Sequence, residues 1–258
     1  MPRRLGQHFL KPPFAERLLA AIDPRPEDTW IEIGPGTGAM TLPLADRARR
    51  VVAVELDSRL AARLRERVPP NVEVVTGDAL EVDLRELVPP GSRLVGNVPY
   101  YVSSPLMRRF LGLRGHLVDL HVMLQEEVAG RIASPPGSKD YGILSVLYGL
   151  WAETTELLRF GPAAFRPSPA VNSTALRVRF LSGPREDPGS EAALETLLKQ
   201  AFARRRRTLE NNLQDSYANL KENLRLLNIA GSRRPETLSV VEFAKLSATL
   251  KPRVRPGA

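Results

Sequence analysis

The chain has 258 residues, of which 43% are hydrophobic and 26% charged, a composition that is typical of a folded globular protein and excludes wholesale disorder. This length fits one large domain, or one large and one small domain. The sequence contains no cysteine and three histidines, which excludes disulfides, thiolate nucleophiles and cysteine-based zinc sites, and we expect no metal site. No apolar run is long enough to span a membrane and the first ten residues do not resemble a secretion signal, so we expect a cytoplasmic protein.

The formal net charge of +8 is concentrated in the last third of the chain. Residues 181–258 hold 14 Lys and Arg against 9 Asp and Glu, a net charge of +5, which leaves +3 for the first 180 residues. A basic segment attached to a nearly balanced body suggests a polyanionic partner, although a basic surface can also serve solubility alone.

Short β-branched runs alternate with helical patterns between residues 29 and 180, which predicts an α/β protein with a mainly parallel sheet. The expected strands are 29–33, 51–55, 72–75, 94–96, 117–124, 154–160 and 171–180. The expected helices between them are 39–47, 58–68, 105–111 and 126–133. The last two strands have no room for a helix between them, so we expect them to pair antiparallel at one edge of the sheet.

A domain boundary is predicted at residues 182–190, where Gly, Pro, Ser and charged residues gather. Beyond it every pattern is helical, with expected helices at 191–203, 207–213, 220–227 and 240–250. We therefore expect residues 1–181 to form one domain and residues 191–258 to form a small all-helical one.

A glycine-rich loop follows the first expected strand, with glycines at 34, 36 and 38. Glycines allow a tight turn and a close approach of the backbone to a ligand. The spacing also satisfies the dinucleotide fingerprint, and Glu55 ends the second strand where a ribose-binding acid belongs. These residues indicate a nucleoside cofactor without deciding between NAD and another one.

Two later strand ends carry polar groups that could read a base. Asp78 follows the third strand, where its carboxylate could accept a hydrogen bond from an adenine amino group. Asn97, Pro99 and Tyr100 follow the fourth strand and offer two acceptor oxygens beside an aromatic face. A planar base with an exocyclic amine would satisfy all three, since the amine donates while the ring stacks.

Nine motifs occur in the order in which they occur in one known family. They are residues 5–10 (LGQHFL), 32–38 (EIGPGTG), 55–57 (ELD), 77–79 (GDA), 97–100 (NVPY), 123–128 (MLQEEV), 139–142 (KDYG), 165–169 (FRPSP) and 202–209 (FARRRRTL). With these motifs the chain resembles the ribosomal RNA adenine dimethylases, specifically the branch that dimethylates two adjacent adenosines near the 3′ end of small-subunit ribosomal RNA.

The resemblance implies a Rossmann-like class I methyltransferase sheet and S-adenosylmethionine, rather than NAD, as the cofactor. It implies cofactor contacts from His8, Leu10, Gly34, Gly36, Glu55, Asp78, Ala79 and Asn97. In that set Gly34 and Gly36 would approach the methionine part. Glu55 would hold the ribose hydroxyls, and Asp78 would read the adenine.

The resemblance also implies how the target base is held. Asn97 and Pro99 would accept the two amine hydrogens, Tyr100 would stack on the ring, and Phe165 would be a second aromatic against the flipped base. An aryl amine is a poor nucleophile and the methyl donor is strongly electrophilic, so alignment matters more than a strong base or a metal.

The expected partner is small-subunit ribosomal RNA in an immature small subunit, bound by a monomeric enzyme. Arg204, Arg205, Arg206 and Arg207 are the candidate RNA contacts, and if they lie on one helix only two or three of them can face a phosphate track. Three alternatives stay open: an adenine methylase that acts on another RNA or on DNA, a ribosome-assembly or transcription factor with vestigial methylation, and an NAD oxidoreductase. The last is disfavoured because no residue stands out as an acid for hydride transfer.

Overall fold

The computed structural model describes residues 8–253, and the chain divides into two compact units. The first unit takes the residues up to 129 together with 153–180, and the second takes 130–152 together with the residues from 181 onward. Residues 130–152 therefore group with the C-terminal residues, although they precede the boundary expected at 182–190. Residues 5–7 of the first motif lie outside the described residues.

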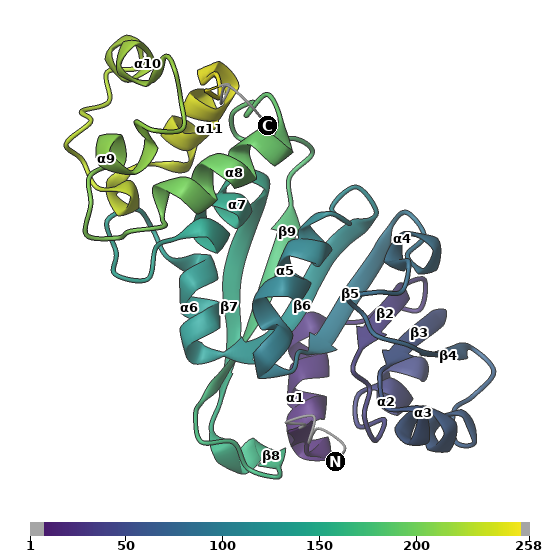
Figure 1. The fold of residues 1–258 in the computed structure, drawn as a ribbon. Coiled ribbons are helices and arrows are strands. Elements are labelled where there is room, and N and C mark those ends of the chain that lie inside the picture. The colour runs from purple at the N-terminus through teal and green to yellow at the C-terminus, as the bar shows by residue number, and fades with distance from the viewer. Residues whose placement is uncertain (1–7, 254–258) are drawn as a thin grey trace. The chain divides into compact units, whose positions relative to one another are not determined.

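A sheet of seven strands forms the first unit, in the order β4-β3-β2-β5-β6-β9-β7 (Figure 1). The strands are β2 (Thr29–Ile33), β3 (Arg50–Glu55), β4 (Val72–Thr76), β5 (Ser92–Asn97), β6 (Leu117–Gln125), β7 (Ala152–Phe160) and β9 (Ser173–Phe180). Neighbouring strands are parallel from β4 through β3, β2 and β5 to β6. Strand β9 runs antiparallel to β6 and neighbours β7 at the edge. The predicted fold class is confirmed.

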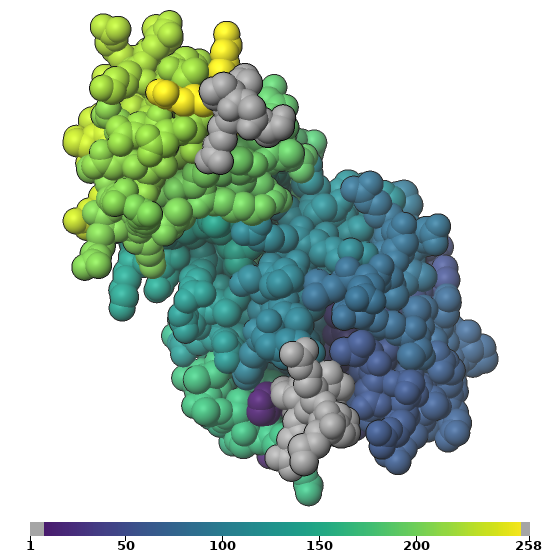
Figure 2. Space-filling view, in the orientation of Figure 1, coloured from purple at the N-terminus to yellow at the C-terminus, as the bar shows by residue number. Residues whose placement is uncertain are grey.

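Helices flank this sheet in Figure 1, and side chains fill the space between the ribbons in Figure 2. They are α1 (Pro12–Ile22), α2 (Thr41–Ala45), α3 (Ser58–Arg65), α4 (Leu84–Leu87), α5 (Ser103–Leu111) and α6 (Glu126–Ala133), the last of which leads into the second unit. All five residues of β2 are buried, as expected for a parallel strand that is covered on both faces.

Helix α1 was not predicted from the sequence. It begins at Pro12, where a missing backbone N–H costs no intrahelical hydrogen bond, and it buries Leu18, Leu19 and Ile22 in the core. The two-residue strands β1 (Phe9–Leu10) and β8 (Phe165–Arg166) were also missed; they pair antiparallel and bring the N-terminal segment to residues 165–167.

The second unit is helical, with α7 (Ile143–Trp151), α8 (Glu191–Ala201), α9 (Leu209–Leu213), α10 (Leu220–Leu226) and α11 (Val240–Thr249). The last four agree with the expected helices apart from their ends. Helix α7 was missed because seven of its nine residues are buried, so it has no polar face and no amphipathic period.

The arginines 204–207 lie in a turn and not on a helix, which corrects the sequence prediction. Helix α8 ends at Ala201, and α9 begins only after Thr208, whose hydroxyl accepts the N–H of Asn211. Between them the Phe202 ring lies against that of Phe243, with centroids 5.6 Å apart. All four arginine side chains are exposed there.

Candidate active site

A cleft of about 860 Å³, part of it open to solvent, lies at the carboxyl ends of β2, β3 and β5. Ligands bind at this edge in open α/β sheets. Nine of the sequence-predicted site residues line it: His8, Gly34, Gly36, Glu55, Asp78, Ala79, Asn97, Pro99 and Tyr100. Segments far apart in the sequence are thus gathered around one cavity.

The glycine loop after β2 has a left-handed backbone at its first two glycines. Gly34 has φ +72° and Gly36 has φ +57°. A Cβ atom on Gly36 would lie 2.7 Å from the ring of Phe9, which also lines the cleft. Any side chain at this position would therefore be strained and would push Phe9 out of place.

Glu55 ends β3 inside the cleft and is only 2% exposed. Its Oε2 accepts the N–H of Gly36 at 2.9 Å, and its Oε1 accepts the N–H of Asp57 at 2.9 Å. Burial raises the pKa of Glu55, while these backbone hydrogen bonds oppose the rise. None of the ion pairs among residues 8–253 involves Glu55, and its oxygens retain lone pairs that can accept hydroxyl donors.

Glu32, on β2, was not singled out as a site residue by sequence reasoning. It is 3% exposed, and its Oε2 has no hydrogen-bond partner among the described residues. Burial raises the pKa of Glu32 to about 7, the Thr41 hydroxyl opposes the rise, and the nearby charge of Glu55 adds to it. The signal in the sequence is a glutamate within the otherwise apolar run Trp30-Ile31-Glu32-Ile33.

Asp78 and Ala79 follow β4 at the same edge. Asp78 Oδ1 accepts the N–H of Leu80 at 2.8 Å, and no hydrogen bond within residues 8–253 uses its Oδ2. Ala79 is 8% exposed and presents a small apolar surface beside it. The pair offers one acceptor and a flat contact, as a purine would need.

Asn97 has a fixed amide orientation. Its Nδ2 donates to the main-chain oxygen of His8 at 2.7 Å, so its Oδ1 is the atom left to accept a hydrogen bond. The His8 ring stacks on Tyr100 with centroids 5.4 Å apart and an interplanar angle of 29°. The Tyr100 hydroxyl lies 3.0 Å from the Ser173 hydroxyl, which holds the aromatic ring beside Asn97.

The Pro99 carbonyl is not the free acceptor that we expected from the sequence. It accepts the N–H of Val102 at 3.1 Å in the 3-10 turn η1 (Tyr100–Val102), and the Ser103 hydroxyl, which has one hydrogen to donate, lies 3.2 Å from both this carbonyl and that of Tyr100. Val98 also lines the cleft, and no hydrogen bond of the described residues ends on its carbonyl. Of these two carbonyls, that of Val98 is therefore the one without a partner among the described residues.

Leu10 and Phe165 do not line the cleft. They are Cα partners across the β1–β8 ladder, 5% and 2% exposed, and belong to one cluster of buried apolar residues. In this structure Phe165 is a core residue, because the pairing of residues 9–10 with residues 165–166 turns its ring inward.

Neither a metal centre nor a membrane span is found in the described part of the chain. No group of three or more His, Asp or Glu side chains within residues 8–253 is arranged to hold a metal ion. None of the described helices is long and apolar enough to cross a membrane.

The comparisons with known proteins agree with one another. The model of the family described as ribosomal RNA adenine dimethylase matches residues 2–251. The chain belongs to this family. It is a ribosomal RNA adenine dimethyltransferase, an enzyme of a methyltransferase class that uses S-adenosylmethionine as methyl donor.

Close relatives cover almost the whole enzyme. It is 43% identical to the "Ribosomal RNA small subunit methyltransferase A" of Geobacter metallireducens, over 96% of this chain and 94% of that one. It is 40% identical to the protein of the same name from Bordetella avium, with the same coverage of both chains. Among solved structures, a dimethyladenosine transferase from Plasmodium falciparum has a TM-score of 0.76 at 25% identity, covering 93% of this chain and 96% of that one. The 23S rRNA methyltransferase ErmE has a TM-score of 0.69 at 26% identity, covering 93% and 98%.

Proposed function

We propose that the enzyme transfers methyl groups from S-adenosylmethionine to the exocyclic amines of two adjacent adenosines near the 3′ end of small-subunit ribosomal RNA. The observation that carries this proposal is the paired acceptor at the cleft, formed by Asn97 Oδ1 and the Val98 carbonyl beside the Tyr100 ring. The choice of the small subunit is supported by relatives whose names specify it and that are about 40% identical over nearly the full length.

The cleft suits the cofactor because its buried carboxylates lack cations. Glu55 would accept the ribose hydroxyls, Asp78 the adenine amine, and the backbone at Gly34 and Gly36 would lie against the methionine part. Burial raises the pKa of Glu55, which lines the cleft, and a positively charged ligand beside it would favour its ionised form. When bound, S-adenosylmethionine supplies an electrophilic methyl group.

The residues of the chain then act on the amine of the target base. Asn97 Oδ1 and the Val98 carbonyl accept its two hydrogens, which fixes the amine and favours localisation of its lone pair on nitrogen. Tyr100 holds the base plane. Positioning of this kind can lower the activation free energy by up to ~7–11 kcal/mol in favourable cases. The N–C bond forms as the bond from the methyl carbon to sulfur breaks, and the cationic amine then loses one proton to solvent. One hydrogen remains on the amine, so one of the two acceptors is enough for the second transfer.

Asn97→Ala tests this chemistry. We expect methyl transfer to undermethylated small subunits to fall by about 100-fold or more in single-turnover assays, because one positioned acceptor is lost. The affinity for the subunits should change little. Asn71→Ala is the matched control, since Asn71 binds the carbonyls of Ala45 and Ala48 at the other end of the sheet. Normal turnover by the Asn97 variant would contradict the proposal.

We also propose that the first domain carries the cofactor site and that the helical one binds RNA through the arginine turn 204–207. The turn is exposed, and its unit carries much of the net positive charge. Arg205 is partly used within the unit, since its guanidinium donates to the carbonyls of Lys139 and Tyr141. Arg204, Arg206 and Arg207 are therefore the stronger candidates for phosphate contacts.

The RNA-binding proposal is tested by replacing Arg204 and Arg207 with Gln. The slope of log affinity against log salt for small subunits should flatten by roughly 1.4–1.8 if both contact phosphate. The double variant of Arg25 and Arg50 removes the same charge from side chains that pair with carboxylates, and it serves as the control. Equal slopes for the two double variants would assign the arginine turn to packing or solubility.

A further inference from the structure

Tyr101 is a large aromatic residue left exposed at the cleft. Five large hydrophobic residues are exposed within residues 8–253: Leu56, Tyr101, Val118, Val171 and Leu226. Only Leu56 and Tyr101 of these line the cleft, with exposed fractions of 43% and 60%. An aromatic ring that is both solvent-exposed and part of a binding cleft is a candidate contact for a ligand.

The topology places Tyr101 in the half of the cleft that receives the target base. Glu55 and Leu56 follow β3 and Asp78 follows β4, on one side of β2, and these are the residues proposed for the ribose and adenine of the cofactor. Tyr101 lies in η1 after β5, on the other side of β2, and directly follows Tyr100. Leu56 therefore belongs to the cofactor half, and Tyr101 to the substrate half.

We propose that Tyr101 forms a stacking subsite at the mouth of the cleft for the nucleobase next to the target adenosine. This inference rests on the proposed function. A base that enters the cleft leaves the RNA stack, so the adjacent base loses a stacking partner on that side. An aromatic ring restores this contact for any base, because every base has a π-face. With two adjacent target adenosines, a subsite on one fixed side of the pocket would hold the other adenosine in one of the two reactions and the flanking base in the other, which an aromatic face tolerates because every base has a π-face.

The test separates an aromatic face from mere bulk. Tyr101→Ala should raise the KM for undermethylated small subunits by about 5- to 150-fold, the range that loss of one base–aromatic stack produces. Tyr101→Phe should stay within about twofold of the natural enzyme, and Tyr101→Leu should fall between the two. The single-turnover rate at saturating subunits and the calorimetric Kd for S-adenosylmethionine should be unchanged in all three.

Val118→Ala is the matched control, since Val118 is 53% exposed but lies at the start of β6, outside the cleft. An unchanged KM for Tyr101→Ala would overturn the subsite, and so would a weaker Kd for S-adenosylmethionine, which would make Tyr101 a cover for the cofactor. A lower rate at saturating subunits with an unchanged KM would also overturn it. If the natural enzyme itself fails to methylate small subunits, it is the proposed function that is wrong.

Discussion

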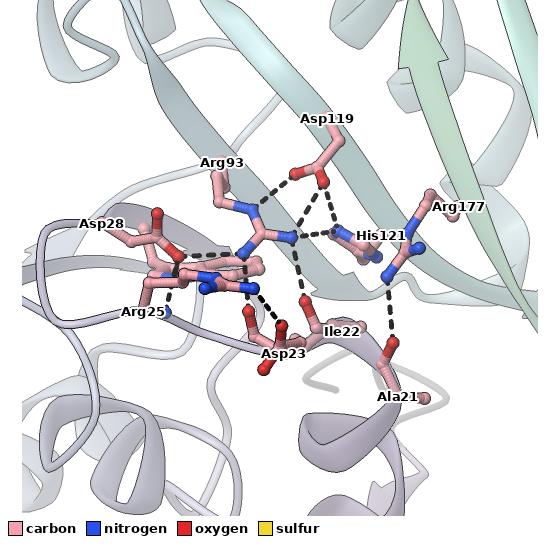
Figure 3. A network of polar contacts seen from close by, with 10 residues as sticks. Ala21, Ile22, Asp23, Arg25, Asp28, Arg93, Asp119, His121 and Arg177 are labelled. Carbon is pink, nitrogen blue, oxygen red and sulfur yellow. Dashed lines mark hydrogen bonds and ion pairs between the residues drawn. The ribbon is translucent and has the colours of Figure 1, made fainter.

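The two ends of the central sheet differ in whether a buried charged side chain has a partner of opposite charge. At the amino ends of β5 and β6, Arg93 is surrounded by acceptors (Figure 3). Its Nε and Nη2 bind the Asp119 carboxylate at 2.8 Å, and its Nη1 binds Asp28 at 2.9 Å. Its Nη2 also caps the Ile22 carbonyl at 2.9 Å, and the guanidinium carbon lies 4.3 Å from the centroid of the Trp30 ring. At the carboxyl end, Glu32 and Glu55 have no cation partner within residues 8–253.

The pKa values of the carboxyl groups follow this difference. Burial alone would raise the pKa of Asp119, but hydrogen bonds from His121 and Arg93 outweigh it and hold the pKa well below its usual range. Glu32 and Glu55 are buried to a similar extent, and their pKa values are raised because no cation offsets burial. A carboxylate with a raised pKa at the edge of a cleft is a candidate for ligand binding, whereas Asp119, paired with Arg93, has a structural role.

The largest expected effect comes from removing Arg93, the cation at the amino end of the sheet. Arg93→Leu should lower the free energy of unfolding by ~3–5 kcal/mol, because it leaves the buried Asp119 and the partly buried Asp28 without their cation. Urea unfolding checks this, followed by the fluorescence of Trp30 in a Trp151→Phe background. Arg50→Leu removes an exposed pair with Glu73 and should cost no more than ~1 kcal/mol. Similar losses for the two variants would remove the contrast between buried and exposed pairs.

The sheet and most of the cleft could be predicted because their signals are local. A strand such as β2 is a short apolar run, and the glycine loop, Glu55 and Asn97 follow strand ends that parallel topology gathers at one edge. The Arg93 network could not be predicted in this way, since its partners come from α1, the loop before β2, and β6. Nothing in the local sequence pairs such distant charges.

The errors in the site have the same origin. Whether Pro99 or Val98 offers a free carbonyl depends on the 3-10 turn that closes onto Pro99, which the Asn-Val-Pro-Tyr motif does not reveal. Phe165 is buried through its pairing with Leu10, 155 positions earlier in the chain. The arginine run reads as part of a helix until the Thr208 cap, which starts α9 only after the run, is seen in the structure.

A second prediction concerns Glu32 and the dependence of the free energy of unfolding on pH. The pKa of Glu32 is raised from 4.5 to about 7, so the folded protein binds more protons than the unfolded chain between these values. Protonated Glu32 therefore stabilises the fold by up to ~3 kcal/mol. This stabilisation is fully present below pH 4.5 and is lost as the pH rises through 7. Glu32→Gln should remove this loss and gain stability over the natural enzyme between pH 5 and 8.

At the amino end of the sheet, we expect His121 to make stability depend on pH in the opposite direction. Burial lowers the pKa of His121, so stability falls as the pH drops through the usual histidine range near 6.5. This contribution should persist in the Glu32→Gln variant and disappear in His121→Asn. Urea titrations at several pH values measure both slopes. A flat difference between Glu32→Gln and the natural enzyme would show that Glu32 is paired in solution.

The smallest effect expected is on cofactor binding. Glu55→Ala should weaken S-adenosylmethionine by ~1–3 kcal/mol, the cost of leaving buried hydroxyl donors unpaired. Calorimetric titration measures it, and Glu73→Ala, which removes an exposed carboxylate from the neighbouring strand, is the control. The substitution also frees the N–H groups of Gly36 and Asp57, so the unfolding curve of the variant must be recorded alongside. If the affinity drops while stability at pH 8 is kept, Glu55 is a binding group whose burial costs the free protein stability. Unchanged affinity, or binding of NAD without S-adenosylmethionine, would contradict the proposal that the unpaired carboxylate of Glu55 binds this cofactor.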